Sequence, residues 1–139
     1  KANVFYTVNH IHASFVDKAH QTSAKYPDEV NEFLEVGLTE EYLDGINVPF
    51  VKESPIKYLL SLKEIVPITL NATFLVIGQL EQVLIDPSLQ PTADGFLELD
   101  QIGSICSNGL DAYYTTELLD RYVYARPGVA VQKIAIKNS

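Results

Sequence analysis

The amino-acid sequence predicts a mainly β protein, a β-barrel that carries helical segments. Two long stretches in the middle of the chain alternate apolar and polar residues with period two, which is typical of strands. Strands and helices do not alternate regularly along the chain, and this argues against a parallel βαβ sheet. The chain has 139 residues and is 47% hydrophobic, which suffices for one domain with its own core.

The first predicted elements are a strand and a helix. Residues 4–8 are rich in β-branched and aromatic side chains, so they are predicted as a strand. Apolar residues then recur at helical spacing over residues 14–25, and Ser14 or Asp17 could cap the start of this helix. Pro27 is expected to end it, because proline cannot continue a helical hydrogen-bond ladder.

A second, short helix is predicted over residues 28–34, with Asp28 as its cap. Gly37 suits the left-handed position that often follows a helix. Residues 39–55 mix glycine, proline and apolar residues, and are predicted as an irregular connection with a short strand near Phe50.

The longest strands are predicted in the middle of the chain. Residues 58–65 alternate strictly, and residues 74–86 form a longer run with apolar members throughout. The alternation changes phase near Gly78 and Gln79, which indicates a bulge or bend of the kind that barrel strands need.

The C-terminal third is predicted to contain more turns and shorter elements. Residues 86–95 have turn composition, and residues 97–105 could hold a short helix. Asp111 is expected to cap another short helix that starts at Ala112. The last two strands are predicted at residues 121–125 and 129–136, joined by a hairpin turn at Arg126-Pro127-Gly128.

Charge and composition exclude several classes of function. The chain has 18 acidic and 10 basic residues, a net charge of −8, which argues against a nucleic-acid polymer or an anionic membrane as partner. No apolar run approaches the ~20 residues that span a bilayer. The single cysteine cannot form an internal disulfide, so a reducing, cytoplasmic location is expected. The chain has no methionine, and we expect it to be part of a longer protein.

Short motifs along the whole chain resemble the flavin reductase-like domain family. Each motif is weak by itself, and their common order and spacing carry the resemblance. They are FYTVN (5–9), AHQTS (19–23), YP (26–27), VNEF (30–33), GLT (37–39), ESPI (53–56), LVIGQL (75–80), DGFL (94–97), GLDAYY (109–114) and YARP (124–127).

The resemblance implies an FMN-binding split β-barrel with helical insertions. It implies that residues 1–139 form one flavin reductase-like domain whose N-terminal strands, with part of the FMN site, are missing. It also implies a homodimer that holds FMN noncovalently and passes a hydride from NAD(P)H to flavin, chemistry that needs no catalytic protein residue. Two alternatives stay open: a flavoredoxin-like electron carrier without nicotinamide turnover, and a split-barrel dimer that has lost flavin.

Candidate cofactor contacts follow the first strand. The Asn9 amide can donate and accept, which suits a flavin edge, although it could instead cap the local backbone. His10 could lie near a flavin or nicotinamide phosphate. His10 and His12 share a strand face, but no third ligand is evident and no metal site is expected. Ser14 joins the expected cofactor-binding residues.

The other candidate contacts lie at the end of the first helix and near Tyr113. The resemblance implies that the polar cluster of Gln21, Thr22 and Ser23 approaches the flavin, although the C-terminal half of a helix is the wrong end for anion binding. Tyr113 or Tyr114 could stack on the flavin ring, or the two could form a buried structural pair. The expected cofactor-binding residues are Asn9, His10, Ser14, Gln21, Thr22, Ser23, Tyr113 and Tyr114.

Overall fold

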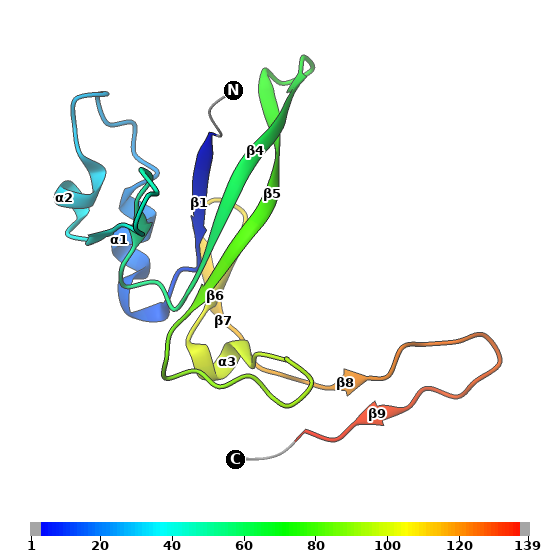
Figure 1. Ribbon diagram of the computed structural model, residues 1–139. Helices are drawn as coiled ribbons and strands as arrows, with labels where there is room; N and C mark the ends of the chain where they lie inside the picture. The colour runs from blue at the N-terminus through cyan, green and yellow to red at the C-terminus, as the bar shows by residue number, and fades with distance from the viewer. Residues whose placement is uncertain (1–3, 137–139) are drawn as a thin grey trace.

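A computed structural model of the chain describes residues 4–136 and confirms a mainly β protein. Its centre is an antiparallel sheet in the order β1-β4-β5, formed by β1 (Phe5–Asn9), β4 (Ile56–Ile68) and β5 (Thr73–Ile85) (Figure 1). β1 pairs only with the first part of β4, from Lys57 to Ser61. The far half of the β4–β5 hairpin therefore projects beyond β1 (Figure 1).

The β4–β5 ladder is irregular on both sides of Gly78, as the change of phase predicts. Gly78 pairs with Leu62, and the register shifts at Lys63 on β4 and at Glu81 on β5. The buried hydroxyl of Ser61 donates to the Glu81 carboxylate at 2.5 Å, which gives the bulged residue a partner. The shifts change which face later side chains occupy.

The first predicted helix exists but is shorter than expected. It consists of a 3-10 turn, η1 (Ala13–Phe15), followed by α1 (Val16–Gln21). The expected caps are wrong: the His12 ring, through Nδ1, accepts the Ser14 N–H at 3.0 Å, and no side chain caps α1. Histidine takes this place because its ring nitrogen can accept a backbone N–H as a serine oxygen would.

The second helix, α2 (Glu32–Val36), begins later than predicted. Its cap is Asn31 and not Asp28: Asn31 Oδ1 accepts the N–H groups of Phe33 at 2.9 Å and Leu34 at 3.4 Å. Gly37 follows the helix with φ of 72°, which confirms its predicted left-handed role.

The remaining elements are short. The strand expected near Phe50 is confirmed, and a helix lies within residues 97–105 as predicted. In the part of the chain described, the strands outside the central sheet form three two-stranded ladders and do not close a barrel. The elements are β2 (Glu40–Glu41), β3 (Phe50–Val51), α3 (Leu99–Ile102), β6 (Ile105–Asn108), β7 (Ala112–Thr115), β8 (Arg121–Tyr122) and β9 (Lys133–Ile134).

The helix expected after Asp111 is wrong, because these residues form β7 in an antiparallel hairpin with β6. Asn108 pairs with Ala112, and the turn between them contains Gly109 with φ of 68°. Two tyrosines and a threonine in succession favour a strand over a helix, and this preference outweighs a possible cap.

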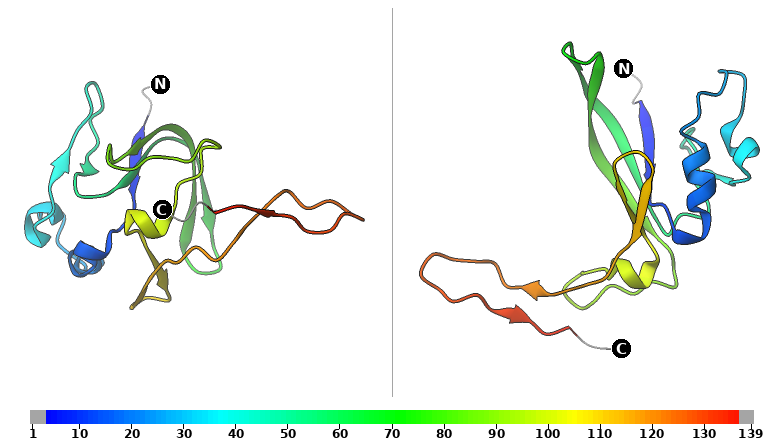
Figure 2. Two further views of the ribbon diagram at one scale, coloured as in Figure 1. Left: turned by 90° about the horizontal axis from the view of Figure 1, so that it is seen from below. Right: turned by 180° about the vertical axis from the view of Figure 1, so that it is seen from behind.

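β8 and β9 begin and end a long arm that extends away from the rest of the molecule (Figures 1 and 2). Only two residue pairs form the ladder, so the predicted strands are much longer than the observed ones. The turn is confirmed, because the N–H of Val129 donates to the carbonyl of Arg126 at 3.2 Å. Tyr124 on the arm is 87% exposed.

The core is small and lies where β1, β3 and β4 meet the helices. Phe50, Ile56 and Leu59 are its most buried apolar side chains. By contrast, the run from Phe74 to Ile77 on β5 is exposed, although it contains no polar residue. No helix within residues 4–136 is long and apolar enough to cross a membrane.

Candidate functional site

Two segments about ninety residues apart in sequence meet beside the exit of β1. The N–H of Ile105 donates to the carbonyl of Ile11 at 3.1 Å, and the N–H of Ala13 donates to the carbonyl of Gly103 at 3.0 Å. These bonds hold the β6–β7 hairpin against the segment that follows β1. A pocket of about 240 Å³ opens between them, lined by Asn9, His10, Ile11, Ile105, Ser107 and Tyr113.

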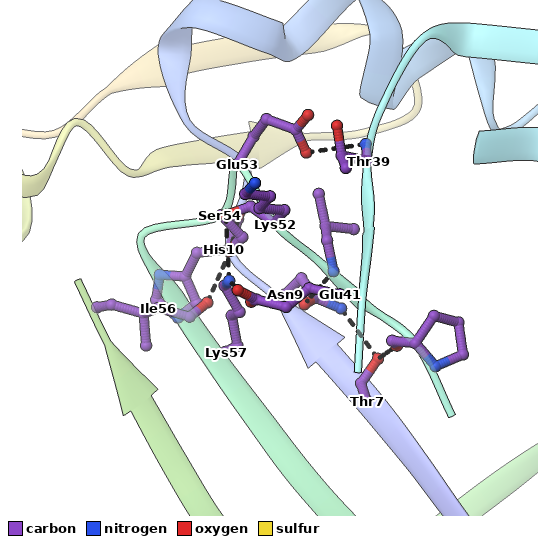
Figure 3. Close-up of polar contacts among 12 residues, drawn as sticks. Thr7, Asn9, His10, Thr39, Glu41, Lys52, Glu53, Ser54, Ile56 and Lys57 are labelled. Atoms are coloured by element: carbon purple, nitrogen blue, oxygen red, sulfur yellow. Dashed lines mark hydrogen bonds and ion pairs between the residues drawn. The ribbon is translucent and has the colours of Figure 1, made fainter. Parts of the chain in front are cut away.

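His10 lines this pocket and all its polar groups are bonded. Its Nδ1 lies 3.0 Å from Ser104 Oγ, and its Nε2 lies 2.9 Å from the hydroxyl of Tyr58. Its N–H donates to Ile56, and its carbonyl accepts from Ser54 Oγ at 2.7 Å (Figure 3). Burial of the ring lowers the pKa of His10 from 6.5, so the ring is neutral at pH 7.

Asn9 joins β1 to β3 (Figure 3). Its Oδ1 accepts the N–H of Val51 at 3.0 Å, and its Nδ2 donates to Thr7 Oγ1 at 3.1 Å. Thr7 in turn donates to the carbonyl of Pro49 at 2.7 Å. Asn9 also lines the pocket, but its side-chain amide bonds towards β3, so a cofactor role for Asn9 stays a prediction.

A partly buried ion pair supports this junction from the side (Figure 3). Lys57 Nζ bonds the carboxylate of Glu41 and the carbonyl of Lys52, the latter at 3.1 Å. Lys57 is only 8% exposed, and its partners satisfy a charge that would otherwise be costly to bury. The pair links β2 to β4 and has a structural role.

Tyr113 and His20 form a second link between the hairpin and the rest of the chain. The Tyr113 hydroxyl lies 2.8 Å from His20 Nδ1, and the rings are perpendicular with centroids 5.7 Å apart. Successive strand residues point to opposite faces, so Tyr114 faces away from the pocket and is 55% exposed. The structure therefore separates the two predicted tyrosines, and only Tyr113 lines the pocket.

The other predicted site residues do not line this pocket. Gln21 Nε2 donates to the hydroxyl of Tyr26 at 2.8 Å. The hydroxyls of Thr22 and Ser23 donate to carbonyls of their own helix, at 2.7 and 2.8 Å. Ser14 Oγ lies 2.7 Å from His12 Nδ1. These contacts shape the ends of α1 and η1, while a cofactor role for the four residues stays a prediction.

The pocket carries no formal charge at pH 7. None of its lining residues is Asp, Glu, Lys or Arg, and its one histidine is neutral. In the part of the chain that the structure describes, no three His, Cys, Asp or Glu side chains gather as metal ligands would. The pocket can therefore bind a neutral, partly aromatic group by packing and hydrogen bonds.

Sequence reasoning missed Tyr58 and Ser104, which hold His10, and Ser107, which lines the pocket. Tyr58 is 48 residues from His10 in sequence and Ser104 is 94 residues away. Periodicity reports which face a residue occupies but not which distant strand lies opposite, so it carries no signal for these contacts.

Comparison with known proteins relates the chain to split-barrel proteins at the level of fold. No family model matches it, and no curated protein matches it either. Among solved structures, it is similar to a protein of Shewanella frigidimarina NCIMB 400 described as a candidate flavin reductase with a split barrel domain. The TM-score is 0.82 and the identity 43%, over 87% of this chain and 61% of that protein.

Two further solved structures share the fold at low identity. Flavoredoxin of Desulfovibrio vulgaris (Miyazaki F) has a TM-score of 0.70 and 19% identity, over 92% of this chain and 65% of that one. The 2-nitrobenzoate 2-nitroreductase of Pseudomonas fluorescens has a TM-score of 0.74 and 16% identity, over 92% of this chain and 62% of that one. The chain thus spans between 61% and 65% of the length of these three proteins.

Proposed function

We propose that the protein is a flavin-dependent oxidoreductase that uses FMN and takes a hydride from NAD(P)H. The observation that carries the proposal is the 43% identity, with a TM-score of 0.82, to a protein described as a candidate flavin reductase. The uncharged pocket between β1 and the β6–β7 hairpin supports it, because such a pocket suits an aromatic ring system.

The pocket fits part of a flavin. Ile11 and Ile105 offer apolar surface, and the half-buried ring of Tyr113 offers an aromatic face for offset stacking. The hydroxyl of Ser107 can bond the polar edge of a ring. A volume of about 240 Å³ is below the ~300–1,000 Å³ of typical ligand pockets, so only part of the cofactor would lie here.

The pocket does not fit the phosphate of FMN. A buried phosphate needs cations or several N–H donors, and no lysine or arginine lines the pocket. The phosphate would therefore be held by groups outside it, from other strands of the domain or from a second copy.

When bound, the flavin ring supplies the redox chemistry, since it can accept a hydride and pass electrons on. The residues of this chain then have three tasks. Tyr113 packs on the ring and excludes water, Ser107 orients it, and neutral His10 keeps the walls of the pocket in place. None of them needs to transfer a proton.

The exposed surface supports a proposal that the domain has further strands and forms a homodimer. The accessible area is 10631 Å², against about 7,200 Å² that surface–mass scaling expects for a folded monomer of this size. Apolar residues of β5 and of the arm are among those that stay exposed, such as Phe74 at 66% and Val131 at 70% exposure. A monomer by light scattering at micromolar concentration would contradict the dimer. We also propose that the protein is cytoplasmic.

A flavoredoxin-like electron carrier is the second candidate, favoured by the similarity to flavoredoxin. The two functions differ in whether nicotinamide reduces the flavin. Stopped-flow mixing of the flavin-loaded full-length protein with NADH and with NADPH separates them. Rapid bleaching of the flavin absorbance supports the reductase, whereas a carrier stays oxidised until a protein partner reduces it.

FMN titration of the full-length protein tests the proposed site. We expect Tyr113→Ala to weaken FMN binding by about 10-fold, corresponding to ~1–1.5 kcal/mol of stacking. Tyr114→Ala is the matched control, because this tyrosine lies on the other face of β7. Equal losses for both variants, or none for Tyr113→Ala, would contradict the site. Residues 1–139 alone should bind FMN more weakly than the full-length protein.

A further inference from the structure

We propose that His10 is a positioning residue: its neutral ring joins Tyr58 of β4 to Ser104 before β6 and thereby sets the separation of the two pocket walls. One wall is the segment after β1, and the other is the β6–β7 hairpin. The effect on ligand binding rests on the proposed function, whereas the effect on the hairpin does not.

The hairpin depends on few attachments. No ladder joins β6 or β7 to the central sheet within residues 4–136; the segment that leaves β1 and the segment that leads into β6 pair in an isolated bridge between His12 and Ser104. Two side-chain hydrogen bonds join this region to other elements in the described part of the chain. His10 bonds Ser104, just before β6, and His20 bonds Tyr113 on β7. Ser104 is 3% exposed, so its hydroxyl has no access to water as a substitute partner.

The hydrogen bonds suit the neutral ring better than the charged one. A neutral imidazole donates through one nitrogen and accepts through the other, so one of the two hydroxyls donates to it. A protonated ring donates through both nitrogens. The hydroxyl that had donated to the ring, on Tyr58 or Ser104, must then turn its hydrogen to another acceptor in a partly buried space.

No neighbouring charge offsets this cost. The groups that face the ring from packed elements are the phenol of Tyr58 on β4 and the hydroxyl of Ser104, and burial is the cause of the lowered pKa of His10. Lys57, bonded to Glu41, lies beside Tyr58 on β4 but points to the opposite face. Protonation of His10 therefore weakens the link that the ring makes between Tyr58 and Ser104, and the pocket walls separate as the pH falls below the range in which the ring is neutral.

Two measurements on the full-length protein test the proposal. The first is amide hydrogen exchange of residues 105–115 without FMN, at pH 7.5 and at a pH below the pKa of His10 as located by NMR titration of its ring, corrected for intrinsic rates. We expect protection to fall at the lower pH in the wild type and to be independent of pH in His10→Gln, whose side chain donates and accepts at both pH values. His20→Gln is the matched control, because it removes the other histidine bonded to the hairpin and should keep the pH dependence.

The second measurement is the dissociation constant of FMN between pH 5 and pH 8. We expect wild-type affinity to fall by up to about tenfold per pH unit below the pKa of His10, and His10→Gln to have a flat profile. Tyr58→Phe should weaken binding about 3- to 10-fold at pH 8, since Nε2 loses its partner.

The outcomes separate this proposal from the proposed function. Absence of FMN binding at every pH would contradict the FMN site, while the exchange experiment would still decide the role of His10. Protection that is equal at both pH values in the wild type, or that falls equally in His10→Gln, would overturn the proposal. If His10→Gln does not fold, NMR titration of the His10 ring in the wild type decides: hairpin amides whose shifts do not follow that titration would overturn it.

Discussion

The phenol ring of Tyr6 on β1 crosses β4 and lies directly against the backbone of Gly78 on β5. A Cβ at position 78 would come within 2.8 Å of Tyr6 Cζ and 3.0 Å of Cε1, and still closer to the hydroxyl oxygen. The two outer strands of the sheet thus touch across the middle one. Gly78 has an ordinary backbone conformation, so space and not φ requires glycine there.

Gly78→Ala should destabilise the fold by ~1–2 kcal/mol, because the Tyr6 ring must move away from a well-packed position. Urea unfolding measures the loss. Tyr6→Phe removes the atom that lies closest, so the double variant should recover part of the stability. Strictly additive effects in this cycle would show that the two residues do not interact.

Gly103→Ala should cost more stability than Gly45→Ala. Both glycines have positive φ, 73° and 76°, so each substitution carries the ~1–2 kcal/mol of a left-handed alanine. A Cβ at Gly103 would also lie 2.6 Å from Cδ2 of His12, whereas nothing lies within 4 Å of one at Gly45. The difference between the two variants in thermal unfolding measures the cost of the His12 contact. Equal losses of stability would argue that the His12 ring moves away freely.

Asn31→Ala should destabilise the protein by ~1 kcal/mol, since Asn31 accepts two N–H groups at the start of α2. Asp28→Ala is the control, because Asp28 is the cap that the sequence favours and the structure does not use. Its effect should be close to zero. A larger loss for Asp28→Ala in chemical denaturation would contradict the observed start of the helix.

Arg121→Gln should raise the pKa of Asp94 from about 2 towards 3.8, because hydrogen bonds from Arg121 and then Thr92 hold it low. A lowered folded-state pKa stabilises the fold fully above 3.8, and this contribution is lost as the pH falls through about 2. NMR titration of the Asp94 carboxyl carbon measures the shift. Lys133→Gln, which removes the other ion pair of the arm, should leave Asp94 unchanged.

Much of the secondary structure could be predicted because its causes are local. The alternation of residues 58–65 and 74–86 predicted β4 and β5, and the phase change near Gly78 predicted their irregular register. Errors arose where two local preferences compete. Asp28 and Asn31 can both cap a helix, and only the path of the chain selects Asn31.

The candidate site was predicted only in part, for the same reason. Asn9, His10 and Tyr113 line one pocket, and their predicted role in cofactor binding stays a prediction. Gln21, Thr22 and Ser23 instead bond their own helix or the nearby Tyr26. Polar residues at the end of a helix suit the local backbone as well as a ligand, and composition does not distinguish the two uses.

The sequence by itself determined the mainly β class, the order of the long strands and the turns at Gly37 and Arg126, because propensity and periodicity act over a few residues. Only the tertiary structure decided that His10 meets Tyr58 and Ser104, and that Tyr113 faces the pocket while Tyr114 does not. These contacts depend on which distant segments pack together and in which register. Many residues determine that packing jointly, through burial of apolar surface and satisfaction of buried polar groups.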